Sequence, residues 1–365
     1  QPSRHDYKPE DRAWLEQHYG PLEEIDLEIT ETLEYQPGLL YVKRHEVPKY
    51  AVTGADGERT MITPAKATSP IPGSQVGVTL LAHTLVSKYV DHLPLNRISE
   101  QFARDGLRIS RQRLCDYSLS SAEVLRPIAE QIHRDALACE ILHSDDTTLA
   151  QQEQGKRKTR TARLWAYLGR GRSDGAIPVS YCYTQGRSQE AVLAELAGFR
   201  GYLQADAFIG YLNAEAREPG LSFVACFAHA RRRFEKVARQ QKTFGRAHGV
   251  MKMITALYQI EGRLRDRGVT DPQAVRAERQ ARSVPILRRL RRRLERMAVS
   301  LPPKSDLGEA TNYALNHWQA LTRYTEDGRL EPDNNRCERA LRGVCVGRKN
   351  WNFVGNERGG RALAT

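Results

Sequence analysis

The sequence of 365 residues lacks the marks of membrane, secreted and repeat proteins. It contains no run of about 18 apolar residues, so no transmembrane helix is expected. Its first residues, Gln1–His5, are polar and unlike a secretory signal. No internal repeat or low-complexity tract is visible, which argues against a solenoid or fibrous protein. These absences leave a globular protein without a membrane partner.

Cysteine is sparse, and its six positions are scattered at 115, 139, 182, 226, 337 and 345. No Cys-x-x-Cys pair exists, so we expect reduced, mostly buried thiols in a cytosolic protein. The spacing Cys226-x-x-His229 resembles half of a zinc site, but no second Cys/His pair has metal-ligand spacing. Polar positioning near acidic groups, or phosphate binding by the arginines that follow (Arg231, Arg232), is the preferred interpretation.

Acidic residues are outnumbered by basic ones. The chain has 44 Asp and Glu against 56 Lys and Arg, a net charge of +12. This excess suits a polyanionic partner, and nucleic acid is preferred over an anionic membrane surface. Hydrophobic residues make up 40% of the chain, enough to build a core at this length. At about 100–200 residues per domain, two or three domains are expected.

The first third of the sequence predicts short elements followed by helices. We expect a helix near 10–19, short strands within 36–60 closed by a turn at 53–57, and a proline-rich linker at 64–73. Apolar spacing then predicts helices over 76–90 and 95–104, and Ser110 stands where the N-cap of a third helix belongs.

The segment from 95 onward therefore has the outline of a helix-turn-helix. The helix that begins after Ser110 would place Arg111, Gln112 and Arg113 in its first turn, within reach of phosphates or base edges. An ordinary helical hairpin with solvated arginines is the alternative.

The middle of the chain predicts one mixed α/β sheet. Apolar runs indicate five strands, with a helix over 188–199 between the third and the fourth. The strands are expected at 138–145, 162–168, 177–183, 202–206 and 222–227. Residues 231–325 are helical in pattern and basic, and an apolar stripe (Leu287, Leu290, Leu294, Met297) is surrounded by arginines. Such a face either lies on DNA or is simply solvated.

Three carboxylates stand in unusual settings. Asp145 and Asp206 end apolar strands, and Glu338 lies on a predicted helix that begins near Asp333, four residues after Asn334. Hard oxygen ligands gathered at one point suit Mg²⁺ or Mn²⁺. We therefore predict two ions, with Asp145 as the shared ligand, Asp206 on one ion and Glu338 on the other. For each acid alone the alternatives are a helix N-cap, a solvated strand end, or for Glu338 an ion pair with Arg342.

The segment 342–355 follows as a glycine-hinged basic loop that contains an aromatic residue. Arg348, Lys349 and Asn350 are candidates for phosphate binding, and Trp351 either stacks on an unpaired base or belongs to the core.

These stretches resemble the family-66 transposases of bacterial insertion sequences. The resemblance runs from about residue 35 to the end, and it includes Lys88–Leu95 ahead of the predicted DNA-binding helices. Its motifs are His143–Thr147, Leu203–Tyr211, Cys226–Phe234, Asp333–Arg342 and Gly347–Trp351.

The resemblance implies a ribonuclease-H-like core with an Asp-Asp-Glu triad, interrupted before the glutamate by a helical insertion. It assigns the metal-ligand roles to Asp145, Asp206 and Glu338. We further predict that His229, Asn334 and Asn335 support these acids. The resemblance also implies DNA cleavage and strand transfer at terminal inverted repeats, and double-stranded DNA of the element ends and the target as partners. A homo-oligomer on paired ends, accessory proteins of the same element and a cytoplasmic, nucleoid-associated location are also expected.

The expected organisation has four parts. Residues 1–73 form an N-terminal region with short strands and a linker, and 74–135 form the helical, helix-turn-helix-like DNA-binding region. Residues 136–235 and 326–365 form the catalytic core, and 236–325 form the basic helical insertion.

The chain departs from the family in three places. Asp146 stands where the family usually has Glu, and Asp145 is kept as the predicted ligand. The stretch 50–55 has no cysteine where the family commonly carries a zinc element, so no zinc is expected. The chain begins without Met and stops at Thr365 where the family continues into further helix, so we expect a fragment lacking both ends. The alternatives to an active transposase are a catalytically inactive truncated relative that represses transposition and a simple metal-dependent nuclease.

Overall fold

The computed structural model describes residues 9–21, 40–44, 50–53, 58–62, 69–172, 174–241 and 243–365. The chain divides into two units, residues 1–46 and 47–365, and each is described by itself. In the first unit, α1 (Pro9–Tyr19) agrees with the predicted helix, and 40–44 form no strand although one was predicted there. Residues 36–39 and most of the predicted turn at 53–57 lie outside the described residues.

The second unit begins with a small hairpin and a group of helices. β1 (Tyr50–Thr53) pairs antiparallel with β2 (Arg59–Ile62). The helices are α2 (Val78–Leu85), the π-helical turn η1 (Val86–Val90), α3 (Leu95–Arg104) and α4 (Arg111–Leu137). The predicted cap of α4 is confirmed, because the Ser110 hydroxyl accepts a hydrogen bond of 3.2 Å from the backbone N–H of Arg113.

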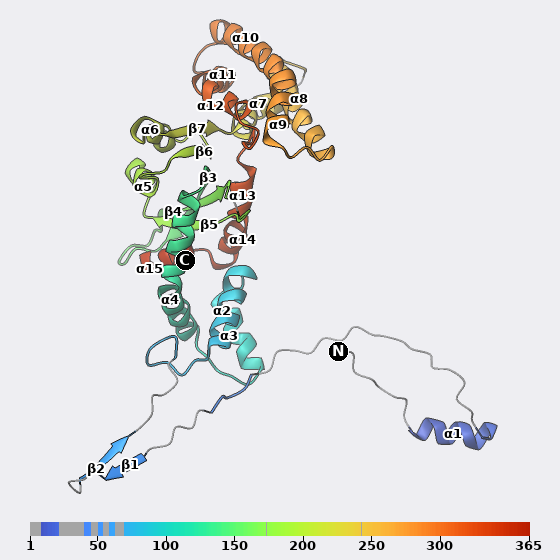
Figure 1. Cartoon of the computed structure of the whole chain (residues 1–365), viewed down its shortest axis with the longest axis vertical. Coiled ribbons are helices and arrows are strands. Elements are labelled where there is room, and N and C mark those ends of the chain that lie inside the picture. Colours follow the sequence, from blue (N-terminus) through green and yellow to red (C-terminus); the bar gives the residue numbers. More distant parts are fainter. Residues whose placement is uncertain are drawn as a thin grey trace. The chain divides into compact units, whose positions relative to one another are not determined.

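A five-stranded sheet forms the centre of this unit, in the order β5-β4-β3-β6-β7 (Figure 1). Its strands are β3 (Ile141–Gln151), β4 (Arg160–Arg170), β5 (Val179–Thr184), β6 (Gly201–Ala205) and β7 (Leu221–Ala225). β4 pairs antiparallel with both β3 and β5, whereas β6 pairs parallel with β3 and β7 pairs parallel with β6. The predicted mixed α/β fold is confirmed, and this arrangement is that of a ribonuclease-H-like core.

The first strand of the sheet extends further than predicted. Asp145 was expected to end it, but β3 continues for six residues to Gln151. The reason is that β3 has two different neighbours. Its parallel pairing with β6 stops at His143, while its antiparallel pairing with β4 continues to Gln151. Asp145 therefore lies inside a strand, just beyond the point where the parallel neighbour ends.

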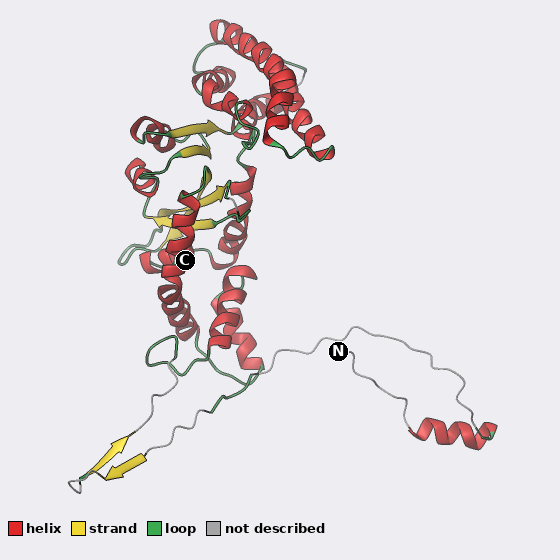
Figure 2. Cartoon of the chain, in the orientation of Figure 1, coloured by secondary structure: helices red, strands yellow, loops and turns green. Residues whose placement is uncertain are grey.

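Helices cover both faces of the sheet, and Figure 2 shows the strands enclosed between them. α4 packs against β4 and β5, whereas α13 (Asn335–Ala340) packs against β3 and β4. α5 (Gln189–Glu195), α6 (Ile209–Arg217), α14 (Arg342–Trp351) and α15 (Glu357–Ala364) also lie near the sheet. No helix in the part of the chain that the structure describes is long and apolar enough to cross a bilayer.

The predicted basic loop at 342–355 is mostly helix, which corrects the sequence interpretation. α14 occupies Arg342–Trp351, and its glycines serve close packing and not hinge motion. A Cβ atom on Gly347 would lie 2.8 Å from Nε1 of Trp351 and 3.3 Å from Nδ1 of His92. From the sequence the glycines were interpreted as flexible, because the packing of Gly347 against the distant His92 leaves no mark in a local pattern.

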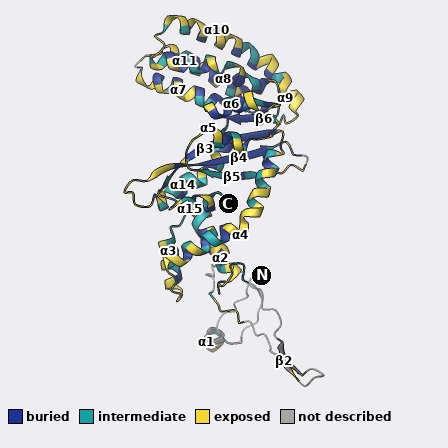
Figure 3. Ribbon diagram, turned by 90° about the vertical axis from the view of Figure 1, so that its left-hand side faces the viewer, coloured by how far each residue is buried: buried dark blue, intermediate teal, exposed yellow. Residues whose placement is uncertain are grey.

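The helical character predicted for 231–325 is confirmed, and this segment lies between β7 and α13. Its elements are α7 (Phe227–Gln240), α8 (Arg246–Asp266), α9 (Pro272–Glu278), η2 (Arg279–Ser283), α10 (Val284–Ser300), α11 (Asp306–Asn316), α12 (Trp318–Thr322) and η3 (Arg323–Thr325). The predicted apolar stripe of α10 is buried, and Figure 3 shows exposed residues along the other side of that helix.

A buried arginine fastens this helical segment to the chain that returns to the sheet. Arg279 forms an ion pair with Glu261 at 2.7 Å, and their side chains are 3% and 8% exposed. The same guanidinium donates to the backbone carbonyls of Tyr324, Asp327 and Leu330 at 2.9 to 3.1 Å. Because five hydrogen bonds satisfy one buried charge, the path of residues 324–330 is closely specified.

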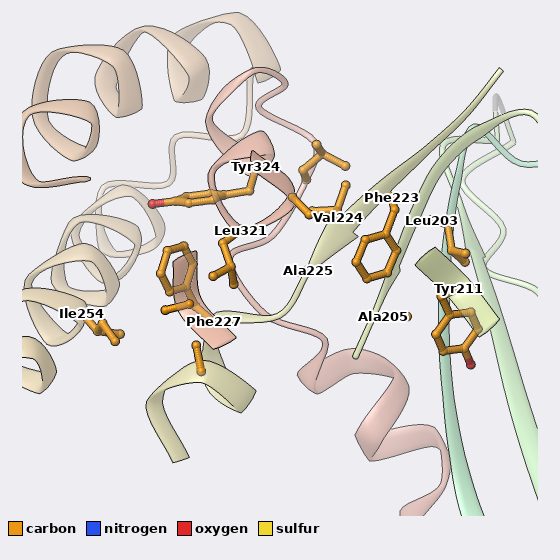
Figure 4. Close-up of a cluster of buried hydrophobic side chains, with 14 of the residues drawn as sticks. Leu203, Ala205, Tyr211, Phe223, Val224, Ala225, Phe227, Ile254, Leu321 and Tyr324 are labelled. Atoms are coloured by element: carbon orange, nitrogen blue, oxygen red, sulfur yellow. The ribbon is translucent and has the colours of Figure 1, made fainter. Parts of the chain in front are cut away.

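One hydrophobic core joins the sheet to the helical segment. Leu203 of β6 and Phe223 of β7 pack with Tyr211 of α6, and the same cluster continues through Phe227 to Tyr324 (Figure 4). The rings of Phe227 and Tyr324 meet edge to face at 5.9 Å between centroids. The sheet edge beyond β6 and β7 is thereby a rigid base for the side chains that follow those strands.

Candidate active site

The register of two parallel strands brings Asp145 and Asp206 to one place. His143 of β3 pairs with Gln204 of β6, and Asp206 follows directly after β6. Continuing this register by two residues sets Asp145 beside Asp206. Their charges interact, because Asp206 raises the pKa of Asp145. The predicted first two acids therefore converge at the end of β6.

Glu338 reaches the same place on α13, which a buried asparagine attaches to β3. The Asn334 side chain accepts a hydrogen bond from Nδ1 of His143 at 3.0 Å and donates to the carbonyl of Ser144 at 2.8 Å. Its backbone N–H lies 3.2 Å from Sγ of Cys226. Asn334 and His143 are fully buried, so these bonds lie in a medium that strengthens them. The helix that carries Glu338 is thus fixed relative to the strand that carries Asp145.

A second attachment comes from β6. The buried Gln204 side chain donates to the backbone carbonyls of Glu331 and Asp333, the latter at 3.1 Å. It also accepts from the backbone N–H of Glu331 at 3.3 Å. The chain just before α13 is therefore held by side chains from both central parallel strands.

The surroundings of Asp145 disfavour its negatively charged form. Burial, followed by the charges of Asp206, Asp146 and Glu338, raises its pKa to about 7, although the backbone N–H of Asp146 acts in the opposite direction. Among the residues that the structure describes, no cationic side chain forms an ion pair with Asp145. A carboxylate in this position is stabilised by any cation that reaches it.

The other two acids are paired with arginines. Asp206 lies 3.0 Å from Nη2 of Arg187. Both carboxylate oxygens of Glu338 accept from Nη2 of Arg232, at 2.8 and 2.7 Å. The arginine partner considered for Glu338 from sequence was Arg342, but the partner in the structure comes from α7.

Asp146 points away from Asp145. Side chains alternate along a strand, so Asp145 shares the face covered by α13, and Asp146 shares the opposite face with Trp165, its partner on β4. There it is 2% exposed and forms ion pairs with Arg163 at 2.7 Å and Arg187 at 2.8 Å. The two neighbouring acids therefore have different environments and different partners.

Cys226 and His229 lie next to Glu338, and one ligand-capable atom from each of the three falls within 4.8 Å of the others. Burial raises the pKa of the Cys226 thiol to about 12. His229 contacts Nη1 of Arg232 at 3.2 Å, and burial followed by the Arg232 charge lowers its pKa. A protonated thiol and a neutral imidazole fit polar positioning near the acids, one of the two roles expected from the sequence.

A second cluster of ligand-type side chains lies outside this site. The Cys182 thiol donates to Glu195 at 3.2 Å, and Nε2 of His133 lies 3.3 Å from the same carboxylate oxygen. Burial, followed by the Glu195 charge, raises the pKa of Cys182. The three side chains are polar partners of one another. They join α4, β5 and α5 on the face of the sheet opposite to Asp145.

The residues predicted to bind DNA are placed in three regions. Arg111, Gln112 and Arg113 are exposed in the first turn of α4, and Arg231 is exposed on α7. Arg348 is already engaged with β3, since it donates to the hydroxyl of Thr147 and the carbonyl of Thr148, both at 2.7 Å.

The rest of the predicted basic segment lies on α14. Lys349 is exposed, and Asn350 donates to the carbonyl of His92 at 3.0 Å. Trp351 is half-buried and lines an apolar cavity of about 380 Å³ with Tyr89. Asn335, predicted to support the site, donates to Oδ2 of Asp333 at 2.8 Å.

Sequence analysis missed the side chains that hold the acids in place. Arg187 lies in the connection between β5 and α5, and Gln204 and His143 lie within apolar strands. Their partners are distant in sequence, so spacing gave no signal. A polar residue inside an apolar strand was the one available indication, because a buried polar group needs a partner.

Comparison with known proteins agrees with this arrangement. A family model described as "Transposase IS66 family" matches residues 73–362. The uncharacterized protein y4jD of Sinorhizobium fredii (strain NBRC 101917 / NGR234) is 33% identical over 354 residues, which cover 94% of this chain and 68% of that protein. The uncharacterized protein y4qI of the same strain is 35% identical over 347 residues, covering 92% of this chain and 63% of that protein. The chain spans about two thirds of the length of these relatives, and it belongs to the IS66 family of transposases.

Proposed function

We propose that this chain cuts DNA at the terminal inverted repeats of an insertion sequence and joins the freed ends to target DNA. Asp145, Asp206 and Glu338 would hold two divalent ions, Mg²⁺ or Mn²⁺. The observation that carries the proposal is the convergence of these acids from two strands and a helix, with Asp145 half-buried and without a cationic partner among the described residues.

The donor set fits hard divalent cations. All three proposed ligands are carboxylates, the oxygen donors that Mg²⁺ and Mn²⁺ prefer. Burial and, after it, the charges of Asp206, Asp146 and Glu338 raise the pKa of Asp145, and a bound cation would relieve this repulsion. Cys226 and His229 lie close by, but a thiol with a pKa near 12 is a poor ligand for a hard ion.

The proposed reaction has two steps. In the first, water hydrolyses a phosphodiester at the element end and releases a 3′-hydroxyl. In the second, that hydroxyl displaces a phosphodiester oxygen of the target in line. When bound, a pair of divalent ions supplies activation of the attacking oxygen and charge stabilisation of the leaving oxygen. The chain supplies no covalent nucleophile; its residues position the acids and bind the DNA.

Two exposed basic surfaces support DNA binding in this proposal. One is the first turn of α4, with Arg111 and Arg113. The other is the exposed side of α10, where Arg288, Arg292 and Arg296 recur every four residues on one helix face. No ion pair involves these three arginines in the described part of the chain, so their charges are available to phosphates.

Cleavage of a labelled duplex tests the proposal. The duplex carries the DNA that flanks this reading frame, and cleavage is followed in Mg²⁺, in Mn²⁺ and in EDTA. We expect metal-dependent cleavage by the wild type, and loss of cleavage with retained gel shift for Asp145→Asn, Asp206→Asn and Glu338→Gln. Asp174→Asn is the matched control, because Asp174 is an exposed acid paired with Arg172 outside the site.

The outcomes separate the alternatives. Cleavage by the Asp206→Asn variant at the wild-type rate contradicts the proposed ligand set. A wild-type gel shift without cleavage in either metal favours a non-catalytic repressor. Cleavage without joining to a target duplex favours a simple nuclease.

A further inference from the structure

One guanidinium bridges the two faces of the sheet at the candidate site. Nε and Nη2 of Arg187 contact Oδ1 of Asp146 at 3.1 and 2.8 Å. Nη2 also contacts Oδ2 of Asp206 at 3.0 Å. The guanidinium lies over the ring of Phe208 at 4.1 Å from its centroid. Arg187 thus connects an acid proposed to bind metal with an acid that faces the other way.

We propose that Arg187 is a positioning residue that orients Asp206 for metal binding, and that the buried Asp146 is the fixed point to which Arg187 is attached. This inference rests on the proposed function, because it assigns roles to residues around the same metal-binding acids. It gives Asp146 a role as the anchor of Arg187 and leaves the metal-ligand role with Asp145.

Asp146 is suited to be an anchor because it is itself immobilised. It lies inside β3, its side chain is 2% exposed, and Arg163 holds its second oxygen, Oδ2, at 2.7 Å. A buried carboxylate held by two arginines and by a strand has little freedom to move.

Both oxygens of Asp206 are then accounted for. Oδ2 is held by Arg187, and Oδ1 accepts from the backbone N–H of Phe208 at 3.3 Å. Each carboxylate oxygen retains a further lone pair for a metal ion. Side chains that hydrogen-bond to metal ligands set the orientation of those ligands, and their loss costs about 10–100-fold in metal affinity or activity.

The shape of arginine matters in this role. Its planar fork reaches two carboxylates at once and stacks on an aromatic ring, whereas a lysine ammonium is a point charge. A conservative Arg187→Lys change therefore keeps the charge and loses the geometry. If Arg187 only neutralises charge, lysine at position 187 should restore metal binding fully. If the guanidinium instead occupies the place of the metal ion and competes with it, removing Arg187 should tighten metal binding.

Mn²⁺ titration of the full chain by calorimetry at pH 8 tests the proposal without relying on catalysis. We expect Arg187→Gln to weaken Mn²⁺ binding about 10–100-fold and Arg187→Lys to restore only part of the loss. Asp146→Asn should match Arg187→Gln, and the double variant should be no weaker than the weaker single variant, because both changes break one connection. Arg172→Gln is the matched control, since Arg172 also bridges two aspartates and is 31% exposed, against 32% for Arg187. It should bind Mn²⁺ within about twofold of the wild type.

Unchanged or tighter Mn²⁺ binding by Arg187→Gln overturns the positioning role, and so does full rescue by lysine. A much larger loss for Asp146→Asn than for Arg187→Gln makes Asp146 a ligand and overturns its role as an anchor. Circular dichroism and unfolding curves verify that each variant is folded. The Asp206→Asn variant separates this inference from the proposed function. If that variant binds Mn²⁺ as the wild type does, the proposed ligand set fails; if it is impaired while Arg187→Gln is normal, only the positioning role fails.

Discussion

Replacing Asp145 by asparagine should stabilise the metal-free protein, although it removes one of the three proposed metal ligands. Asparagine keeps the size of the side chain and a carbonyl oxygen that can accept from the backbone N–H of residue 146, as Oδ1 of Asp145 does at 2.9 Å. It removes a negative charge that burial and three neighbouring acids oppose.

The magnitude follows from the pKa of Asp145, which rises from 3.8 to about 7 on folding. A difference of roughly 3 pH units at about 1.4 kcal/mol per unit gives at most about 4 kcal/mol. Because solvent and side-chain rearrangement relieve part of this cost, we expect Asp145→Asn to raise the free energy of unfolding by about 1–4 kcal/mol.

The pH dependence has a definite sign. Between about pH 4 and pH 7 the folded state of the wild type holds a proton on Asp145 that the unfolded state has released. The stability of the wild type relative to the variant therefore falls as the pH rises through this window, and the full difference is present above pH 7.

Urea unfolding in EDTA at pH 4.5 and at pH 8 measures this effect, and a repeat with Mn²⁺ completes it. The advantage of the variant should be small at pH 4.5 and large at pH 8. Saturating Mn²⁺ should stabilise the wild type and leave the variant nearly unchanged, because a ligand stabilises the form that binds it. A variant that is less stable than the wild type at pH 8 in EDTA, or a difference that does not change with pH, refutes this reasoning.

Three further predictions concern the attachments around the site and the basic surface. Asn334→Ala should lower the free energy of unfolding by about 2–3 kcal/mol, because it leaves buried partners unsatisfied, and it should slow cleavage about 10–100-fold; an unaltered cleavage rate would contradict the proposed attachment of α13. Arg279→Met should cost about 3–5 kcal/mol, because a buried carboxylate loses its partner, and chemical denaturation gives the value directly. Replacing Arg288, Arg292 and Arg296 together by glutamine should make the slope of log K against log salt shallower by about 2–3, at about 0.9 per phosphate contact; a slope equal to that of the wild type would show that α10 does not lie on DNA.

The sequence predicted the elements of the core because local signals agreed with the tertiary structure. Ser110 capped its helix as expected, and the apolar stripe of α10 is buried. The signals failed where a distant partner decided the outcome. β3 extends past Asp145 because β4 continues beside it, and Gly347, interpreted as part of a flexible loop, lies within α14 and packs closely against His92.

The candidate site shows the same division. Asp145, Asp206 and Glu338 were proposed because two of them were expected at strand ends and because their motifs resemble a known family, although β3 continues past Asp145. Arg187 and Gln204 were not identifiable from the sequence. Arg187 lies in a loop and Gln204 in a strand, and their roles depend on the distant residues that they contact, Asp206 and Asp333.

We propose that Asp145, Asp206 and Glu338, carried by two strands and a helix, bind metal together. Anomalous diffraction from crystals of the protein soaked in Mn²⁺ tests it most directly. We expect manganese peaks among Asp145, Asp206 and Glu338, with Asp146 turned away toward Arg163 and Arg187. Manganese elsewhere, or no peak at these acids at a concentration that supports cleavage, would contradict it.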